Sequence, residues 1–366
     1  MNGRLERYVL YRNLTGVAGA FALLSSVILL VQFVDLSRSL AVRADVSAAD
    51  IFGLTLLKSP SVIQLLLPLV FLSGVMFAYV GLNRRSELVA MRAAGISAWR
   101  FITPSAIAAF LAGILAVVAI NPVSAALNAR FEADRAKIMS ESQGAAPAKD
   151  LWLRQGDEHT QMVIHAKSRV TVNGEVRLRG VSMFIYQKTP TGQPEFKRRL
   201  EAAEAVMRPG FWQLTDVREA TAGESSVQSD SLTIRSTLDS ESALESLAAP
   251  DTITFWRLPQ AIEQTEQSGF SAAGYRLRFQ QLLATPLMFA AMAILAAAFS
   301  LRLVRLGGLA SLVGAGMALG FIVYFLNQFS GALGKASIIP TFAAAWAPAV
   351  VALLSGLTLL CYTEDG

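Results

Sequence analysis

Charged side chains that could bind or react lie in two places, both next to long apolar runs. The first is the stretch from Asn83 to Arg100, NRRSELVAMRAAGISAWR, which holds four arginines and one glutamate between two uncharged runs. An acid, a base and apolar residues within one or two helical turns suit docking onto a partner protein. The candidates for these contacts are Glu87, Leu88, Met91 and Arg92.

A second set of basic residues stands at the opposite ends of the apolar runs. Charge beside a membrane is costly unless it faces water, a partner or an anionic ligand. Guanidinium and ammonium groups bind phosphate and carboxylate oxygens, so the set predicts an anion site, and snorkelling to the interface is the alternative. The set is Arg38, Arg43, Lys58, Arg130, Arg135, Arg276, Arg278 and Lys335, with Arg38, Lys58, Arg130 and Arg135 as the leading candidates.

Other chemistry finds no support in the sequence. No Ser-His-Asp or paired-carboxylate pattern can be placed, so no catalytic residue is assigned. His159 and His165 lack a partner cluster and make a poor metal site, and the single cysteine, Cys361, excludes an internal disulfide. A Walker A loop is absent. The nearest match, GALGKAS at Gly331 to Ser337, has the wrong spacing. We expect no cofactor on this chain, and ATP would have to act through a partner.

The elements that must position these residues are membrane spans. Of the 366 residues, 53% are hydrophobic and only 16% are charged, which is typical of a membrane protein. About 20 apolar residues cross the hydrocarbon core as a helix. Six runs are long enough, and we predict transmembrane helices at about 13–34, 59–83, 101–121, 279–301, 306–330 and 340–362.

The orientation follows from the basic residues of the short loops. With the N-terminus inside, arginines and lysines are more numerous on the inner side, which predicts that both termini are cytoplasmic. The net charge of +5 is then an orientation signal, and nucleic-acid binding is not expected. The segment 130–270, between the third and fourth spans, lies outside the cytoplasm in this arrangement.

Segment 130–270 has the pattern of a β domain. LWLRQG, QMVIHAKS, VRLRGVSMFIYQ, FKRRLEAAEAVM and FWQLTDVREA are β-rich blocks, and Asn173-Gly174 and Pro209-Gly210 are turn signals. LPQAIEQTEQSGF predicts a short helix, and SESQGAAPAKD a linker. We therefore predict a membrane half at 1–129, an inserted antiparallel β domain at 130–270, and a second membrane half at 271–366.

Residues 86–94 are predicted to form a short cytoplasmic helix between the second and third spans. Ser86 can cap its start, Glu87 suits the first turn, and Gly95 suits the position just past its end. A solvated turn carrying orientation arginines is the alternative. Pairs of small residues, Gly16 with Ala20 and Gly316 with Gly320, allow close helix packing, within this chain or at a gate.

The layout resembles the LptF/LptG permeases, a family that exports lipopolysaccharide from the Gram-negative inner membrane. The resemblance rests on six spans with a long insertion, on LERYVLYRNL before the first span, and on E-L-x-x-M-R-A-A-G at Glu87 to Gly95. It covers essentially the whole chain. Weak local similarity favours the LptG branch over the LptF branch. One departure is QLLATPL, where Gln280 and Gln281 stand in place of the common basic residue.

The resemblance implies an α-helical membrane protein with six transmembrane helices in a 3+3 arrangement and an inserted periplasmic domain that is β-jellyroll-like. It implies a homologous LptF-like permease partner, a cytoplasmic LptB-like ATPase dimer that contacts the position of Glu87, a single-span LptC-like bridge protein, and lipopolysaccharide as ligand. Spans one and five would form lateral gates. The rival functions are an ion-coupled secondary transporter, disfavoured because the predicted spans hold no acid, and a membrane-anchored assembly protein.

Overall fold

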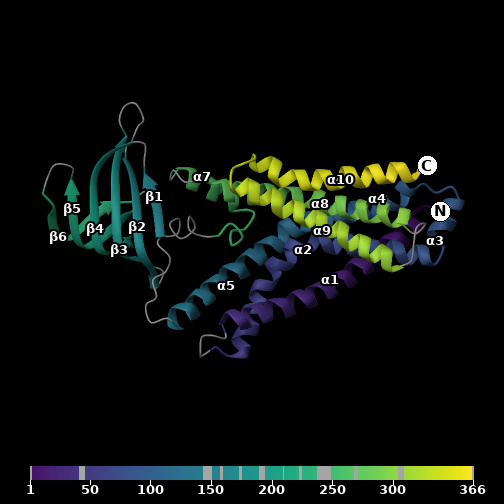
Figure 1. Cartoon of the computed structure of the whole chain (residues 1–366), viewed down its shortest axis with the longest axis horizontal. Coiled ribbons are helices and arrows are strands. Elements are labelled where there is room, and N and C mark those ends of the chain that lie inside the picture. The colour runs from purple at the N-terminus through teal and green to yellow at the C-terminus, as the bar shows by residue number, and fades with distance from the viewer. Residues whose placement is uncertain are drawn as a thin grey trace. The chain divides into compact units, whose positions relative to one another are not determined.

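A computed structural model describes most of the chain and divides it into two compact units. Unit 1, the helical unit, comprises Met1–Ile138, Pro250–Trp256 and Ala273–Gly366, and unit 2, the β unit, comprises Met139–Ala249 and Arg257–Ala272 (Figure 1). The described residues are 2–40, 46–142, 151–156, 160–172, 175–188, 194–208, 210–221, 225–236, 249–267, 271–303 and 309–364. Arg43, His159, Asn173-Gly174, Pro209 and most of the predicted linker lie outside them.

Among the described residues, six stretches of helix are long and apolar enough to cross a membrane, which confirms the predicted fold class of a helical membrane protein with an inserted β domain. The helices extend beyond the predicted apolar cores, because polar residues continue them past the hydrocarbon layer. They are α1 (Asn2–Leu40), α2 (Ala48–Arg84), α4 (Ala98–Leu115) continuing into α5 (Asn121–Ser142), α8 (Ala273–Leu303), α9 (Leu309–Lys335) and α10 (Thr341–Glu364).

The helix that contains the third span does not end near residue 121. A π-helical turn, Ala116–Ile120, joins α4 to α5 at the point where Pro122 lacks an amide hydrogen, and the helix then runs to Ser142. No glycine or proline follows before Ser142 to stop it. The predicted boundary at residue 129 therefore falls inside α5, and the helical unit extends to Ile138.

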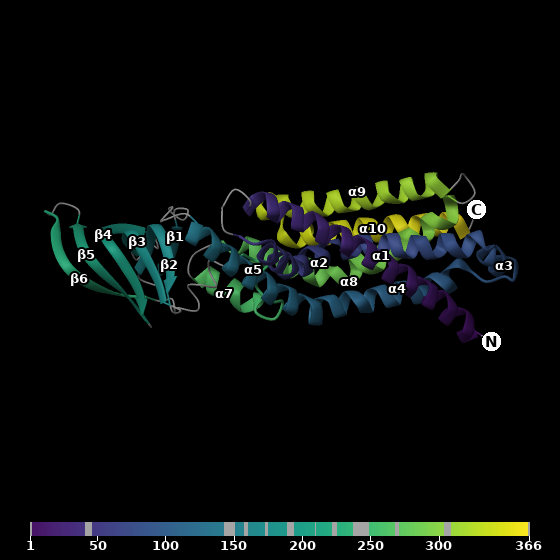
Figure 2. The ribbon, with the colours of Figure 1, turned by 90° about the horizontal axis from the view of Figure 1, so that it is seen from below.

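Helix α8 is the centre of the helical unit. In the most apolar stretch of α8, 67% of the residues are buried, whereas 6% are buried in the corresponding stretch of α1. It packs against α2, α4, α9 and α10, and its alanine-rich stretch from Ala290 to Ala298 lets neighbouring helices approach closely. In both views α3 (Glu87–Ala93) lies at the same end of the helical unit as the two termini (Figures 1 and 2). The two termini and the α2–α4 connection therefore lie on one side of this unit.

The β unit is built on one antiparallel sheet whose described strands follow one another in chain order. Trp212 and Leu214 alternate toward a core, Val217 joins them after one extra residue in the strand, and the other strands complete this core. Gly210 has a φ of 81° at the turn between β4 and β5, which confirms that turn. The strands are β1 (Leu151–Gly156), β2 (Thr160–Val172), β3 (Glu175–Lys188), β4 (Pro194–Arg208), β5 (Phe211–Thr221) and β6 (Val227–Arg235).

The strand order corrects one detail of the predicted β domain. A jelly roll requires Greek-key connections, whereas each of the six described strands pairs with its neighbours in sequence, as in a meander. The predicted short helix is present as α7 (Leu258–Gln267).

Candidate functional site

Helix α3 is the short helix predicted between the second and third spans. Its end is held by a Schellman motif, in which Ile96 N–H bonds to Met91 O and Gly95 N–H bonds to Arg92 O. Gly95 has a φ of 76°, as its predicted place past the helix end requires. Its start differs from the prediction, because Ser86 has a left-handed backbone and its side chain makes no capping hydrogen bond.

The apolar residues of α3 face inward. Leu88 and Met91 are 2% and 8% exposed and belong to the main core of the helical unit. They therefore anchor α3 to the spans and are not on the surface that a partner would meet. Arg92 is half-buried, and Val89, which is 60% exposed, is the large apolar side chain on the outer face. The sequence had predicted, from the spacing of residues along a helix, that Leu88 and Met91 would contact a partner protein.

Glu87 is tied to the first helix. The Tyr8 hydroxyl donates a hydrogen bond of 2.8 Å to Glu87 Oε2, and Arg12 Nε donates one of 3.2 Å to the same hydroxyl. The Arg12 guanidinium also lies 5.5 Å from the centre of the Tyr8 ring. A second tie joins α1 to the start of α4, just after α3, because Arg100 Nε lies 3.6 Å from a carboxylate oxygen of Glu6. The position of α1 is thus linked to that of α3.

Lys58 lies in a polar network at the other end of the helical unit. Its Nζ donates a hydrogen bond of 2.9 Å to Asn128 Oδ1 and lies 3.8 Å from Glu132 Oε1. The ammonium group is 5.1 Å from the centre of the buried Phe131 ring, and the Arg135 guanidinium is 6.0 Å from the same ring. Two of the predicted headgroup residues, Lys58 and Arg135, therefore meet at one aromatic side chain of α5.

A cleft of about 600 Å³ opens beside Lys58 within the helical unit. Its polar lining includes Lys58, Arg278, Lys335 and Asp251, with the amides of Gln64, Gln281, Asn327 and Gln328. Val62, Leu65, Leu282, Met288 and Phe289 form an apolar wall. Cations above an apolar wall can hold an anionic headgroup and part of an acyl chain.

The four leading basic candidates do not form one site. Lys58 lines the cleft, whereas Arg38, Arg130 and Arg135 are not among its lining residues, and Arg38 and Arg130 are exposed. Arg278 and Lys335 take their place. Both belong to the predicted basic set, and Arg278 stands directly before an apolar run, where an arginine requires a polar partner or ligand. Nothing in the sequence pointed to Asp251.

The glycine pairs serve packing within the chain. A Cβ on Gly16 would lie 2.4 Å from the carbonyl oxygen of Gly74, so α1 and α2 are in backbone contact there. A Cβ on Gly316 would meet Met76, and one on Gly320 would meet Leu69 and Leu72, which seats α9 on α2. Ala20 is half-buried on α1.

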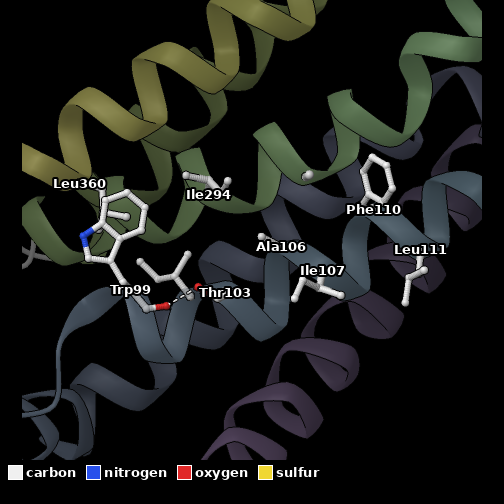
Figure 3. A pocket seen from close by; sticks show the side chains of 10 residues that line it. Trp99, Thr103, Ala106, Ile107, Phe110, Leu111, Ile294 and Leu360 are labelled. Atoms are coloured by element: carbon white, nitrogen blue, oxygen red, sulfur yellow. Dashed lines mark hydrogen bonds between the residues drawn. The ribbon is translucent and has the colours of Figure 1, made fainter.

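A second, smaller pocket of about 320 Å³ lies between α4, α8 and α10. Figure 3 shows Phe110, Ile107 and Ile294 along it, with Trp99 and Leu360 at one end. The Thr103 hydroxyl is turned to its own helix, where it donates to the carbonyl oxygen of Trp99. The lining is almost entirely apolar and offers no group that would select an anionic ligand.

Comparison with known proteins agrees with this arrangement. Residues 7–362 match the family described as "Lipopolysaccharide export system permease LptF/LptG". The chain belongs to this family. The permease is 25% identical over 372 residues to lipopolysaccharide export system permease protein LptG of Escherichia coli K12, with 98% of each chain covered. The LptG protein of Escherichia coli O6:H1 gives the same values. The permease is thus a multi-pass inner-membrane protein and a lipopolysaccharide export permease subunit.

Proposed function

We propose that this permease is the LptG-like half of an ATP-driven exporter, and that α3 receives the force of ATP hydrolysis from a partner. The proposal rests on how α3 is attached to the helical unit. Leu88 and Met91 anchor it in the core of the spans, while Glu87 and Val89 lie on its accessible side. A partner that pushes on α3 therefore moves buried side chains of the bundle directly, because a close-packed interior transmits displacement.

The proposed assembly has four other components. They are an LptF-like permease half, two copies of an LptB-like cytoplasmic ATPase below α3, and an LptC-like bridge protein with one span. The termini and α3 are cytoplasmic and the β unit is periplasmic, in agreement with the distribution of basic residues. This chain binds no cofactor of its own in the proposal, and ATP acts through the partner.

The cleft beside Lys58 is the proposed site for the anionic headgroup of lipopolysaccharide. Lys58, Arg278 and Lys335 supply three positive charges, and the amides beside them supply further hydrogen-bond donors. The apolar wall would hold the first part of an acyl chain. The β unit then receives the extracted lipid and passes it toward the outer membrane.

The test is a mild-detergent purification of the tagged chain from its native membrane, with bound proteins and lipids identified by mass spectrometry. We expect a homologous six-span protein, a small soluble ATPase and lipopolysaccharide. The chain recovered alone, from a preparation in which other membrane complexes stay intact, would refute the proposal.

The variant Glu87→Lys tests the role of α3 in the same preparation. Reversing the charge on its accessible side should release the ATPase and leave the six-span partner bound. Asp134→Lys is the matched control, because Asp134 is an exposed acid on α5. Equal ATPase recovery from both variants would remove Glu87 from the coupling role.

A further inference from the structure

Residues Pro250–Trp256 form a short tethered segment that belongs to the helical unit, although they lie between two parts of the β unit in sequence. Two buried asparagines of α5 hold it. Asn121 Oδ1 accepts a hydrogen bond of 2.8 Å from the Phe255 amide, and Asn128 Nδ2 donates one of 3.1 Å to Asp251 Oδ2. These asparagines are seven residues apart, which places them on one face of the helix. The Phe255 ring also stacks on Phe279, with 5.3 Å between ring centres.

This tether brings Asp251 to the cationic end of the cleft. Asn128 bonds to Asp251 through Nδ2 and to Lys58 through Oδ1, so one buried amide joins the acid to the base. Asp251 is also the opposite charge that acts on the Arg278 guanidinium. Asp251 is the acidic residue among those that line the cleft, and the basic residues are Lys58, Arg278 and Lys335. Even when Glu132, whose Oε1 lies 3.8 Å from Lys58 Nζ, is counted with Asp251, the cleft retains an excess of positive charge.

Arg278 is not fully satisfied by this arrangement. Its Nε is buried and has no hydrogen-bond partner in the described part of the chain. A buried donor without a partner costs free energy that an incoming acceptor recovers. Phosphate oxygens suit this position because they accept two parallel hydrogen bonds from a guanidinium group. A phosphate that approaches Arg278 meets the like charge of Asp251.

We infer that Asp251 is an internal counterion that occupies the cationic end of the empty cleft, and that a phosphate group of the bound lipid displaces it. This rests on the proposed function of the cleft. While the cleft is empty, Asp251 offsets part of the repulsion among three cations. When a phosphate binds, it replaces the carboxylate and adds the second negative charge that the site still lacks.

Displacement of Asp251 has a consequence for the rest of the chain. The tethered segment is followed directly by α7 and preceded by the strands of the β unit. Loss of the bond between the Asp251 carboxylate and Asn128 removes one tie of the segment, while the Phe255 bond to Asn121 and the Phe255–Phe279 stack remain. Filling of the cleft thus weakens the attachment of the tethered segment, through which the chain connects to the β unit. Loading of the lipid is thereby linked to the domain that would receive it.

The test is the binding of fluorescent bisphosphorylated lipid A, and of the same lipid without phosphates, to the purified full complex. Asp251→Asn removes the charge and keeps an oxygen that can accept from Asn128. We expect this variant to bind the bisphosphorylated lipid about tenfold more tightly, since one like charge is removed at close range. Its affinity for the dephosphorylated lipid should be unchanged. Asp134→Asn, an exposed acid on α5, should alter neither affinity.

A second variant separates charge from folding within one protein sample. Cys361 is the single cysteine, so Asp251→Cys in a Cys361→Ser background carries one thiol. Modification with a sulfonate reagent restores a negative charge and should return the affinity for bisphosphorylated lipid A toward that of the unmodified chain with Asp251. Modification with a trimethylammonium reagent should raise it further. Equal affinities after the two modifications would overturn the inference.

The outcomes also distinguish this inference from the proposed function. If the chain with Asp251 binds both lipids equally, the cleft is not a headgroup site and the proposed function of the cleft fails. If it prefers the bisphosphorylated lipid and Asp251→Asn binds that lipid no more tightly, only the role of Asp251 fails.

Discussion

The close contact between α1 and α2 predicts the effect of adding a side chain at Gly74. A Cβ on Gly74 would lie 2.4 Å from Val17 Cα and 2.7 Å from Val17 N. Ordinary contacts begin near 3.4 Å, and both close atoms belong to backbone, which no side-chain rotation can relieve. Gly74→Ala therefore forces α1 and α2 apart by about 1 Å along the side of α1 that packs on α2.

The cost can be estimated against a matched control. Gly81 is also in α2, and a Cβ there would meet nothing within 4 Å. Both changes to alanine gain the same helix propensity, so their difference reports packing alone. Overpacking of this kind costs about 1–3 kcal/mol. We therefore expect Gly74→Ala to be less stable than Gly81→Ala by that amount.

The assay is the unfolding of both variants in detergent with increasing dodecyl sulfate, followed by tryptophan fluorescence. A lower midpoint for Gly74→Ala alone is the expected result. Equal midpoints for the two variants would show that the backbones of α1 and α2 do not approach as closely as described. The glycines would then have to be explained by contacts with another chain.

Three further predictions concern the two ends of the helical unit. Tyr8→Phe keeps the ring and removes the hydroxyl that binds Glu87, so it should lower lipid-stimulated ATP hydrolysis of the complex about two- to fivefold, while Tyr11→Phe, on the exposed face of α1, should not. Leu88→Ala should destabilise the chain by about 2–5 kcal/mol in thermal unfolding, whereas Val89→Ala should leave stability unchanged and reduce ATPase recovery. Lys58→Asp should reduce crosslinking of lipopolysaccharide beside residue 58 with normal ATPase assembly.

Each of the three has an outcome that counts against it. Equal hydrolysis by the Tyr8 and Tyr11 variants would mean that the hydroxyl does not position Glu87. An unaltered melting temperature in Leu88→Ala would contradict the inward face of α3. Arg130→Asp is the comparison for Lys58→Asp, because Arg130 is exposed and does not line the cleft. The same loss of crosslinking in both variants would indicate a general effect of surface charge.

The parts of the fold that follow from local patterns were predictable from the sequence. Apolar length identified all six spans, and alternation with turn residues identified the β-rich blocks. Gly95 and Gly210 adopt the positive φ that their turns require. The length of α5 was missed because polar helix residues beyond the membrane carry no hydropathy signal, although the absence of glycine and proline allowed the helix to continue.

The candidate site was predictable only in part. A seven-residue helix is too short for periodicity to decide which face is covered, so Leu88 and Met91 were assigned to the wrong side of α3. Lys58 was found from its position beside an apolar run. Asp251 could not be found, because its partner Asn128 is 123 residues away and only folding brings them together.

The continuous run of helix from Ala98 through the π-helical turn to Ile138 determines how far the cleft lies from the end of the helical unit that carries α3. Its 41 residues span about 60 Å at 1.5 Å per residue, which is about twice the thickness of the hydrocarbon core. Asn128, the partner of Lys58, lies about 45 Å along this helix from Ala98. In the proposed membrane orientation, Lys58 and Asp251 would therefore lie at the level of the lipid phosphates, where water and ions keep the energetic cost of unoccupied charge low. In the proposed function, a lipid would then exchange its phosphate counterions for those of the protein at the depth that its phosphates already occupy.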